Sequence, residues 1–294
     1  MKLFVCFFLW VSCVFSVERM KVASLHPLMT DLLRQIGGKQ IVIVEIGKEG
    51  FNVHEFQPDS KDIRALQDCQ LVVASGKGIE VYLPDLKDSL SKDQEVIEVG
   101  KYVPTQEVDP KSALYACCPA HANSGSSDPH WWHNASYMAR AAKSLGKELG
   151  KHDEKYKDLY KQRGQALSDK YRDLDKWVKS EVLKIDKKNR HLVTAHAAFG
   201  YFCDAYGFKA SYVKGLSAKA EISAKDLANS IRNIKDEKIP AVFPEVHGNR
   251  KMIQQIAKEV QCKVGEPLTA DGHYSDYEKM IRSNVSSIVD ALKR

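Results

Sequence analysis

The chain has 294 residues, of which 44% are hydrophobic, and a formal net charge of +6. This length suffices for two domains with full cores. Lysines, arginines and acidic residues are interleaved along the expected helices, so the small positive excess makes no basic patch and nucleic acid is not an expected partner. Beyond the N-terminal segment, the sequence contains no run apolar enough to cross a membrane.

The first 16 residues predict a secretory signal peptide. After a basic start, the chain is continuously apolar from Leu3 to Trp10, and small or apolar residues follow up to Ser16. This pattern is typical of an exported protein that is cleaved after Ser16. A lipid anchor at Cys13 is the alternative, but Trp10 stands where a small aliphatic residue is usual. We therefore expect a soluble protein of the periplasm.

Short apolar runs alternate with helical segments along the rest of the chain. Strands are predicted at residues 22–25, 41–46, 71–74 and 96–99, and again at 192–195, 210–213, 241–244 and 263–265. Helices are expected at 28–36 and 60–66. Such alternation indicates parallel sheets with flanking helices. We expect an α/β fold with two Rossmann-like lobes, formed by residues 17–150 and 188–294.

Two helical stretches without proline lie between these lobes. Asn134 is a suitable N-cap for a helix that runs to about Leu149. A second helix, expected from about His152 to Ile185, has apolar residues on one face at steps of three, four and seven. Such a helix would be on the order of 50 Å long. Residues 151–187 are thus expected to form one long rigid helix that joins the lobes, although a helical insertion in an enzyme is an alternative.

Residues 104–128 show no periodicity and predict a surface loop. This loop contains His121 near Cys117 and Cys118, which could recruit metal, although a plain loop is the simpler interpretation. Two of the seven cysteines belong to the predicted signal peptide. Among those that remain, Cys203 and Cys262 both fall in the second lobe and could form a disulfide, which export permits.

Three of the ten histidines stand where ligands commonly bind. His54 follows the second strand of the first lobe, His196 ends the first strand of the second lobe, and His130 opens a helix. Ligands of open parallel sheets bind beyond the carboxyl ends of the strands. Imidazoles that face one cleft suit Zn²⁺, with a carboxylate to complete a tetrahedron. Each histidine taken alone could instead be a capping or core residue.

Several segments resemble the metal-specific solute-binding proteins of ABC importers, the cluster that handles zinc and manganese. The main ones are Phe51–Pro58, Asp128–Trp132, Val193–Phe202 and Glu266–Thr269. The first departs from the family's pattern, because Asn52-Val53 replaces the usual Asp-Pro. The resemblance covers essentially the whole mature chain. It implies two α/β lobes joined by one rigid helix, with the metal in the cleft between the lobes.

The resemblance also implies the ligands. His54, His130 and His196 match its three histidine positions, and Glu266 is the expected fourth ligand. Asp271 or a water molecule are the alternatives, although Asp271 stands in an Asp-Gly pair that is typical of a turn. A histidine rather than a glutamate at position 196 favours Zn²⁺ over Mn²⁺, with Mn²⁺ as a second cargo. His133 is expected on the surface at the start of a helix.

The sequence therefore predicts a protein that captures Zn²⁺ and delivers it to a membrane-embedded ABC permease, acting as a monomer and without catalysis. A zinc hydrolase is the main alternative, because three histidines with an open fourth position would suit a catalytic zinc. Against it, His54-Glu55 lacks the second histidine of an HExxH motif, and the candidate general bases are Glu55 and Asp271 alone. A surface adhesin with the same fold is a third interpretation.

Overall fold

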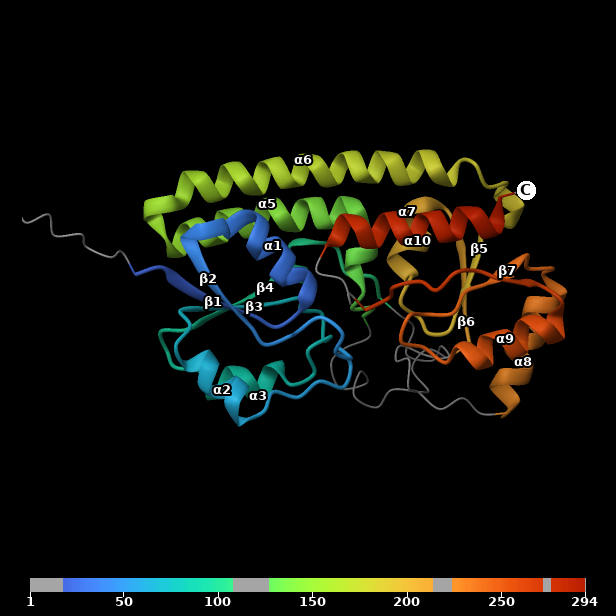
Figure 1. Cartoon of the computed structure of the whole chain (residues 1–294), viewed down its shortest axis with the longest axis horizontal. Coiled ribbons are helices and arrows are strands. Elements are labelled where there is room, and N and C mark those ends of the chain that lie inside the picture. The colour runs from blue at the N-terminus through green and yellow to red at the C-terminus, as the bar shows by residue number, and fades with distance from the viewer. Residues whose placement is uncertain (1–17, 108–126, 214–223, 272–275, 294) are drawn as a thin grey trace, which may run out of the picture.

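The computed structural model describes residues 18–107, 127–213, 224–271 and 276–293. In these residues the chain forms two lobes that lie side by side beneath one long helix (Figure 1). The predicted signal peptide and the His121 segment lie outside the described residues. None of the described helices is both long and apolar enough to cross a membrane.

The first lobe has a sheet of four parallel strands in the order β2-β1-β3-β4. The strands are β1 (Met20–Ser24), β2 (Ile41–Glu45), β3 (Leu71–Ala74) and β4 (Glu95–Glu98). The helices that follow them are α1 (Pro27–Gly37), α2 (Ser60–Gln67) and α3 (Leu83–Ser89). The four strands predicted from the sequence of this lobe coincide with the observed ones to within two residues at each end.

The second lobe has two pairs of parallel strands. β5 (His191–Thr194) pairs with β6 (Lys209–Tyr212), and β7 (Ala241–Val242) pairs with β8 (Lys263–Val264). A parallel bridge between Thr194 and Phe243 connects the two pairs. The helices of this lobe are α7 (Gly200–Tyr206), α8 (Ala224–Asp236), α9 (Arg250–Val260) and α10 (Tyr277–Leu292).

Two helices, α5 (Ala135–His152) and α6 (Lys157–Val182), connect the lobes. The Asn134 side chain caps α5, as predicted, by accepting the backbone N–H of Ser136 at 3.0 Å. The 26 residues of α6 make it about 39 Å long. It is shorter than expected because it begins only after a short 3-10 helix at Glu154–Tyr156 and ends at Val182 rather than Ile185. Figure 1 shows α6 running above α5 and on over the second lobe. Gly146 permits this packing, since a Cβ there would lie 2.6 Å from the Tyr160 carbonyl oxygen.

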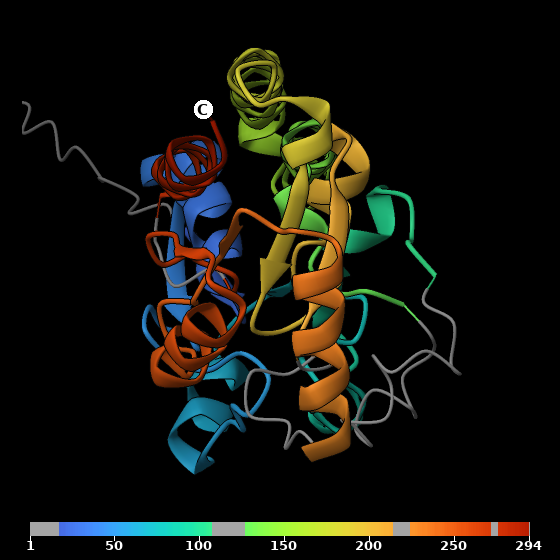
Figure 2. The same cartoon turned by 90° about the vertical axis from the view of Figure 1, so that its right-hand side faces the viewer.

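The apolar core is continuous between the lobes. One cluster of buried side chains includes residues of β1 and β3 in the first lobe, of α5 and α6, and of β5, α7 and α10 in the second lobe. Two smaller clusters lie on the opposite sheet faces, one beside α2 and α3 and the other beside α8 and α9. In Figure 2 the helices α6 and α10 are at one end of the molecule, and α8 and α9 are at the other. Both lobes therefore share the core that α6 covers.

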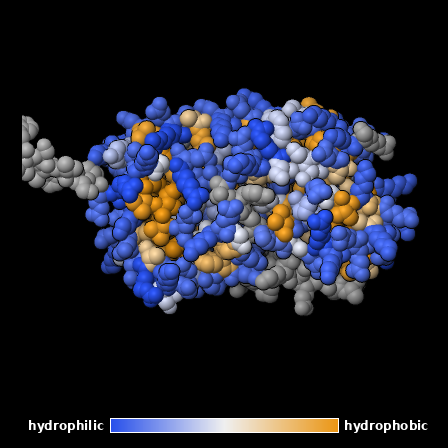
Figure 3. Space-filling view, in the orientation of Figure 1, coloured by the Kyte–Doolittle hydropathy of each residue, from blue (hydrophilic) through white to orange (hydrophobic). Residues whose placement is uncertain are grey.

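The face of the molecule shown in Figure 3 is largely hydrophilic. Figure 3 shows one larger hydrophobic patch, over the part of the first lobe where β2 lies. β2 is an edge strand, and Val42 to Glu45 are only partly buried. In the second lobe, Cys203 and Cys262 are free thiols, so the disulfide considered from the sequence is not formed.

Candidate metal centre

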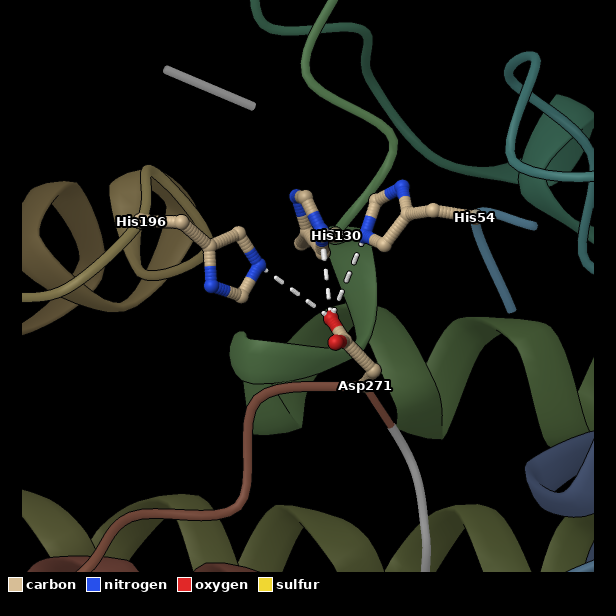
Figure 4. Close-up of side chains that lie close together, drawn as sticks. All are labelled: His54, His130, His196 and Asp271. Carbon is tan, nitrogen blue, oxygen red and sulfur yellow. Dashed lines mark hydrogen bonds and ion pairs between the residues drawn. The ribbon is translucent and has the colours of Figure 1, made fainter. Parts of the chain in front are cut away.

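Four side chains from distant parts of the chain meet between the lobes. They are His54 after β2, His130 ahead of the 3-10 helix η3 (Trp131–His133), His196 after β5 and Asp271 after β8. Each offers one ligand atom, and these four atoms all lie within 4.8 Å of one another. Figure 4 shows the three imidazole rings pointing toward the Asp271 carboxylate. The three histidines singled out in the sequence are thus brought together.

Four of the six distances between the ligand atoms match a tetrahedral metal site. Asp271 Oδ1 lies 3.4 Å from Nε2 of His54, 3.5 Å from Nε2 of His130 and 3.3 Å from Nε2 of His196. The Nε2 atoms of His54 and His130 are 3.3 Å apart. Four tetrahedral ligands held about 2.0–2.1 Å from a zinc ion would be separated by about 3.3–3.4 Å. The ligand atom of His196 lies within 4.8 Å of those of the other two histidines, so the cluster approaches the shape that such an ion requires.

The cluster is buried, and its charges are coupled. The side chains of His130 and His196 are 0% exposed, that of His54 is 2% exposed and that of Asp271 is 7% exposed. Burial raises the pKa of Asp271, but the neighbouring imidazoles outweigh this effect and hold that pKa well below its usual range. Burial lowers the pKa of His54, only partly opposed by Asp271. The site thus presents an anionic carboxylate next to an imidazole that favours its neutral, metal-binding form.

A carboxylate outside the cluster orients each of two histidines. Asp128 Oδ1 accepts both the backbone N–H of His130 and its Nδ1–H, each at 2.8 Å. Glu245 accepts the backbone N–H of His196 at 2.8 Å and its Nδ1–H at 2.5 Å. Because a carboxylate can only accept, the neutral form of each ring carries its proton on Nδ1, and in that form the lone pair of Nε2 faces the cluster. Such outer partners fix the tautomer and raise the basicity of a metal-binding histidine.

A turn in the chain presents His54. The backbone N–H groups of Glu55 and Phe56 both donate to the carbonyl oxygen of Asn52, and the Asn52 side chain accepts the N–H of His54 at 3.0 Å. Val53 is buried, with 4% exposure. The two residues that depart from the family's pattern thus form this turn and pack it against the first lobe.

The expectation that Glu266 belongs to the site is wrong for this structure. Glu266 is exposed and lines a separate surface hollow of about 370 Å³ beside α10. Beyond β8 the chain stays paired with the segment after β7, since the Leu268 N–H donates to Pro244 O at 2.9 Å and the Val246 N–H donates to Leu268 O at 3.0 Å. This extension carries the chain past Glu266, so that Asp271 reaches the three histidines.

Two further residues differ from the sequence analysis. Glu245 was missed, although it follows β7 as His54 and His196 follow their strands, and that position was the available signal. His133 is neither on the surface nor in the cluster: it is 1% exposed, and its Nε2–H donates to the Ala270 carbonyl oxygen at 2.8 Å. The indole N–H of Trp132 donates to the same oxygen at 3.0 Å.

Known proteins match the chain over nearly its whole length. Residues 22–291 match the model of the family described as ZnuA, zinc-uptake complex component A, periplasmic. The manganese-binding lipoprotein MntA of Bacillus subtilis is 26% identical over 289 residues, which cover 94% of this chain and 90% of the relative. The iron-binding protein YfeA of Yersinia pestis is 26% identical over 282 residues, which cover 93% of this chain and 86% of the relative.

The fold also has close solved counterparts. The periplasmic zinc-binding protein TroA from Treponema pallidum superimposes with a TM-score of 0.83 at 24% identity, and the match covers 94% of this chain and 100% of that one. The expected α/β architecture with two lobes and a long helix is thus confirmed. The family model spans both lobes and every residue of the cluster. The chain therefore belongs to the ZnuA family, whose members are the metal-binding, substrate-binding proteins of ABC metal importers.

Proposed function

We propose that this protein captures Zn²⁺ outside the cytoplasm and delivers it to the permease of an ABC importer. The observation that carries the proposal is the donor set, in which three imidazole Nε2 atoms surround one carboxylate oxygen at 3.3–3.5 Å. Zn²⁺ is usually held by four nitrogen, sulfur or oxygen donors in a tetrahedron. Mn²⁺ prefers more oxygen donors than this cluster offers.

The choice of metal rests on this chain's own residues. The relatives are named for manganese, iron and zinc, so their names do not decide it. For a given set of nitrogen and oxygen donors, divalent ions bind more tightly in the order from manganese through iron to zinc. A donor set with three imidazoles reinforces this order. We therefore expect Zn²⁺ as the main cargo and weaker binding of Mn²⁺.

The same geometry favours transport over hydrolysis. Catalytic zinc sites keep one position open for water, whereas Asp271 stands where the fourth ligand would be. As a metal ligand, Asp271 would not be available as a general base. Glu55, the other candidate general base, has an exposed side chain. A transport protein must surrender its ion to a permease, while a hydrolase must retain it. Fast exchange of bound zinc with a chelator, without hydrolytic activity, would support the transport function.

Competition titration of metal-free protein tests the proposal. The protein is stripped with a chelator and titrated with Zn²⁺, Mn²⁺ and Fe²⁺ against a chromogenic chelator. We expect one tight Zn²⁺ per chain and a loss of more than about 100-fold in His196→Ala, since even an outer partner of a ligand contributes about 10–100-fold. His152→Ala is the matched control, because His152 lies away from the cluster and contacts Glu95 at 3.5 Å. Tighter binding of Mn²⁺, or equal losses in the two variants, would contradict the proposal.

A further inference from the structure

We propose that Trp132 and His133 are positioning residues that hold the Asp271 carboxylate in the metal site. The inference rests on the proposed metal-binding function. Both side chains donate to one acceptor, the Ala270 carbonyl oxygen, at 3.0 Å and 2.8 Å. That oxygen belongs to the peptide group that joins Ala270 to Asp271. Fixing this peptide group fixes the point from which the carboxylate extends.

The two donors belong to the segment that carries another proposed ligand. Trp132 and His133 lie in η3, directly after His130. The neighbouring Trp131 anchors this segment to the first lobe, because its indole N–H donates to the Ser75 hydroxyl at 3.0 Å. Ala270, in contrast, follows β8 of the second lobe. The hydrogen bonds to Ala270 therefore connect two metal-site segments that come from different lobes.

The second lobe also holds the segment that leads to Asp271, through contacts with α10. The amide of Asn284 on α10 bonds both backbone groups of Thr269, with its Oδ1 accepting the N–H and its Nδ2 donating to the carbonyl oxygen, each at 2.8 Å. After the site, Tyr277 at the start of α10 donates its hydroxyl to Trp132 O at 2.7 Å. Asn284 alone would tie Asp271 to its own lobe. Trp132 and His133 add the link that sets its distance from His130.

The burial and packing of His133 suit this positioning role. It is 1% exposed, and its ring packs on Phe199 with 4.3 Å between ring centroids. Because the Ala270 oxygen can only accept, the proton of the ring lies on Nε2. Burial lowers the pKa of His133 to about 3, so the ring is neutral in the pH range in which the protein would bind metal. The donor is therefore present whether or not the neighbouring histidines are protonated.

This arrangement predicts an effect on metal binding that passes mainly through Asp271, because Asp128 holds His130 independently. A carboxylate already held near its bound position does not have to be ordered when the ion arrives, which favours binding. Removing the Nε2–H of His133 should therefore weaken zinc binding while Asp271 is present. It should have little effect once Asp271 has been replaced. A residue that only stabilises the fold would give the same change in both backgrounds.

A double-mutant cycle tests the inference. His133→Phe keeps a ring against Phe199 but removes the donor, and His133→Gln keeps an N–H near the position of Nε2. Zinc affinity is measured by chelator competition for both variants, alone and combined with Asp271→Ala. We expect His133→Phe to weaken binding about tenfold, the lower end for an outer partner, and His133→Gln to weaken it less than about threefold. In the Asp271→Ala background, His133→Phe should change affinity less than about twofold.

The visible absorption of bound Co²⁺ gives a second readout. In His133→Phe this spectrum should shift toward that of Asp271→Ala, whereas His133→Gln should retain the native spectrum. Equal losses in both backgrounds, or an unchanged affinity in His133→Phe, would overturn the inference. If circular dichroism shows that His133→Phe does not fold, Trp132→Phe removes the other donor, keeps an aromatic ring beside His130 and should give the same pattern. Failure of the native protein to bind zinc, or of Asp271→Ala to weaken binding, would instead overturn the proposed function.

Discussion

Replacing Glu245 by glutamine should weaken zinc binding at pH 8 by about tenfold. Glu245 is 5% exposed, and its two oxygens accept the backbone N–H and the Nδ1–H of His196. Glutamine keeps the size but has one acceptor oxygen, so it loses the charge and one of the two bonds. A hydrogen bond to a charged group is worth about 1–1.5 kcal/mol more than a neutral one. Since about 1.4 kcal/mol corresponds to tenfold in affinity, the loss should be of that order.

The loss in Glu245→Gln should become smaller at pH 6. Burial lowers the pKa of His196, but Glu245 and Asp271 outweigh this effect and raise that pKa well above its usual range. In the native protein, protons therefore compete with zinc for Nε2 as the pH falls. The pKa of His196 is lower in the variant, so protons begin to compete with zinc only at a lower pH. Zinc affinity of both proteins should fall on acidification, and that of the native protein should fall more steeply.

Chelator competition at pH 8 and pH 6 measures both effects, with the exposed Glu266→Gln as the matched control. An unchanged affinity of Glu245→Gln at pH 8 would refute the role assigned to the carboxylate. A loss that grows toward pH 6 would refute the argument about proton competition.

Three further predictions concern the site and the fold. Asp271→Ala should weaken zinc binding by more than about 100-fold in a competition titration, whereas Glu266→Ala should leave it unchanged; the reverse ranking would restore Glu266 as the ligand. Burial raises the pKa of Glu80 from 4.5 to about 7, so its contribution to stability is present below pH 4.5 and is lost as the pH rises through 7. Glu80→Gln should therefore reduce the difference in unfolding free energy between pH 5 and pH 8 by up to about 3 kcal/mol, measured by denaturant titration, and an unchanged difference would contradict this. Because α6 lies over both lobes, zinc should change the radius of gyration in X-ray scattering by far less than the closing of a hinged sugar-binding protein does.

Much of the fold could be predicted because the signals are local. The run Leu71–Ala74 is apolar with two β-branched valines at its centre, and the observed β3 has the same bounds as the predicted strand. The order of the strands could not be predicted in the same way, because the place of β1 between β2 and β3 depends on contacts between distant segments. The start of α6 was misjudged by five residues, from His152 to Lys157, because the break at Asp153 has no proline or glycine to mark it.

The residues of the site divide in the same way: some have a local signal in the sequence, and others are placed by contacts with distant segments. His54, His130 and His196 stand in recognisable segments, and the structure brings them together. Glu266 was favoured because the segment Glu266–Thr269 resembles the family's ligand segment and directly follows the last predicted strand. The bridge between Glu245 and Leu268, which extends the pairing beyond that strand, has no signature in the sequence of either segment. The burial of His133 likewise depends on residues that are distant in sequence, such as Phe199.

The core shared by both lobes has a consequence for how an ion would leave. The buried cluster that includes strands of both lobes also includes α5, α6 and α10, so moving the lobes apart would expose apolar side chains to water. Such an opening would carry a large free-energy cost, whereas a rearrangement of the short segments that bear His54, His196 and Asp271 would leave the core intact. An importer that receives an ion from this protein would therefore act on those segments, which follow the carboxyl ends of the strands. The side of the molecule formed by α5, α6 and α10 would stay fixed.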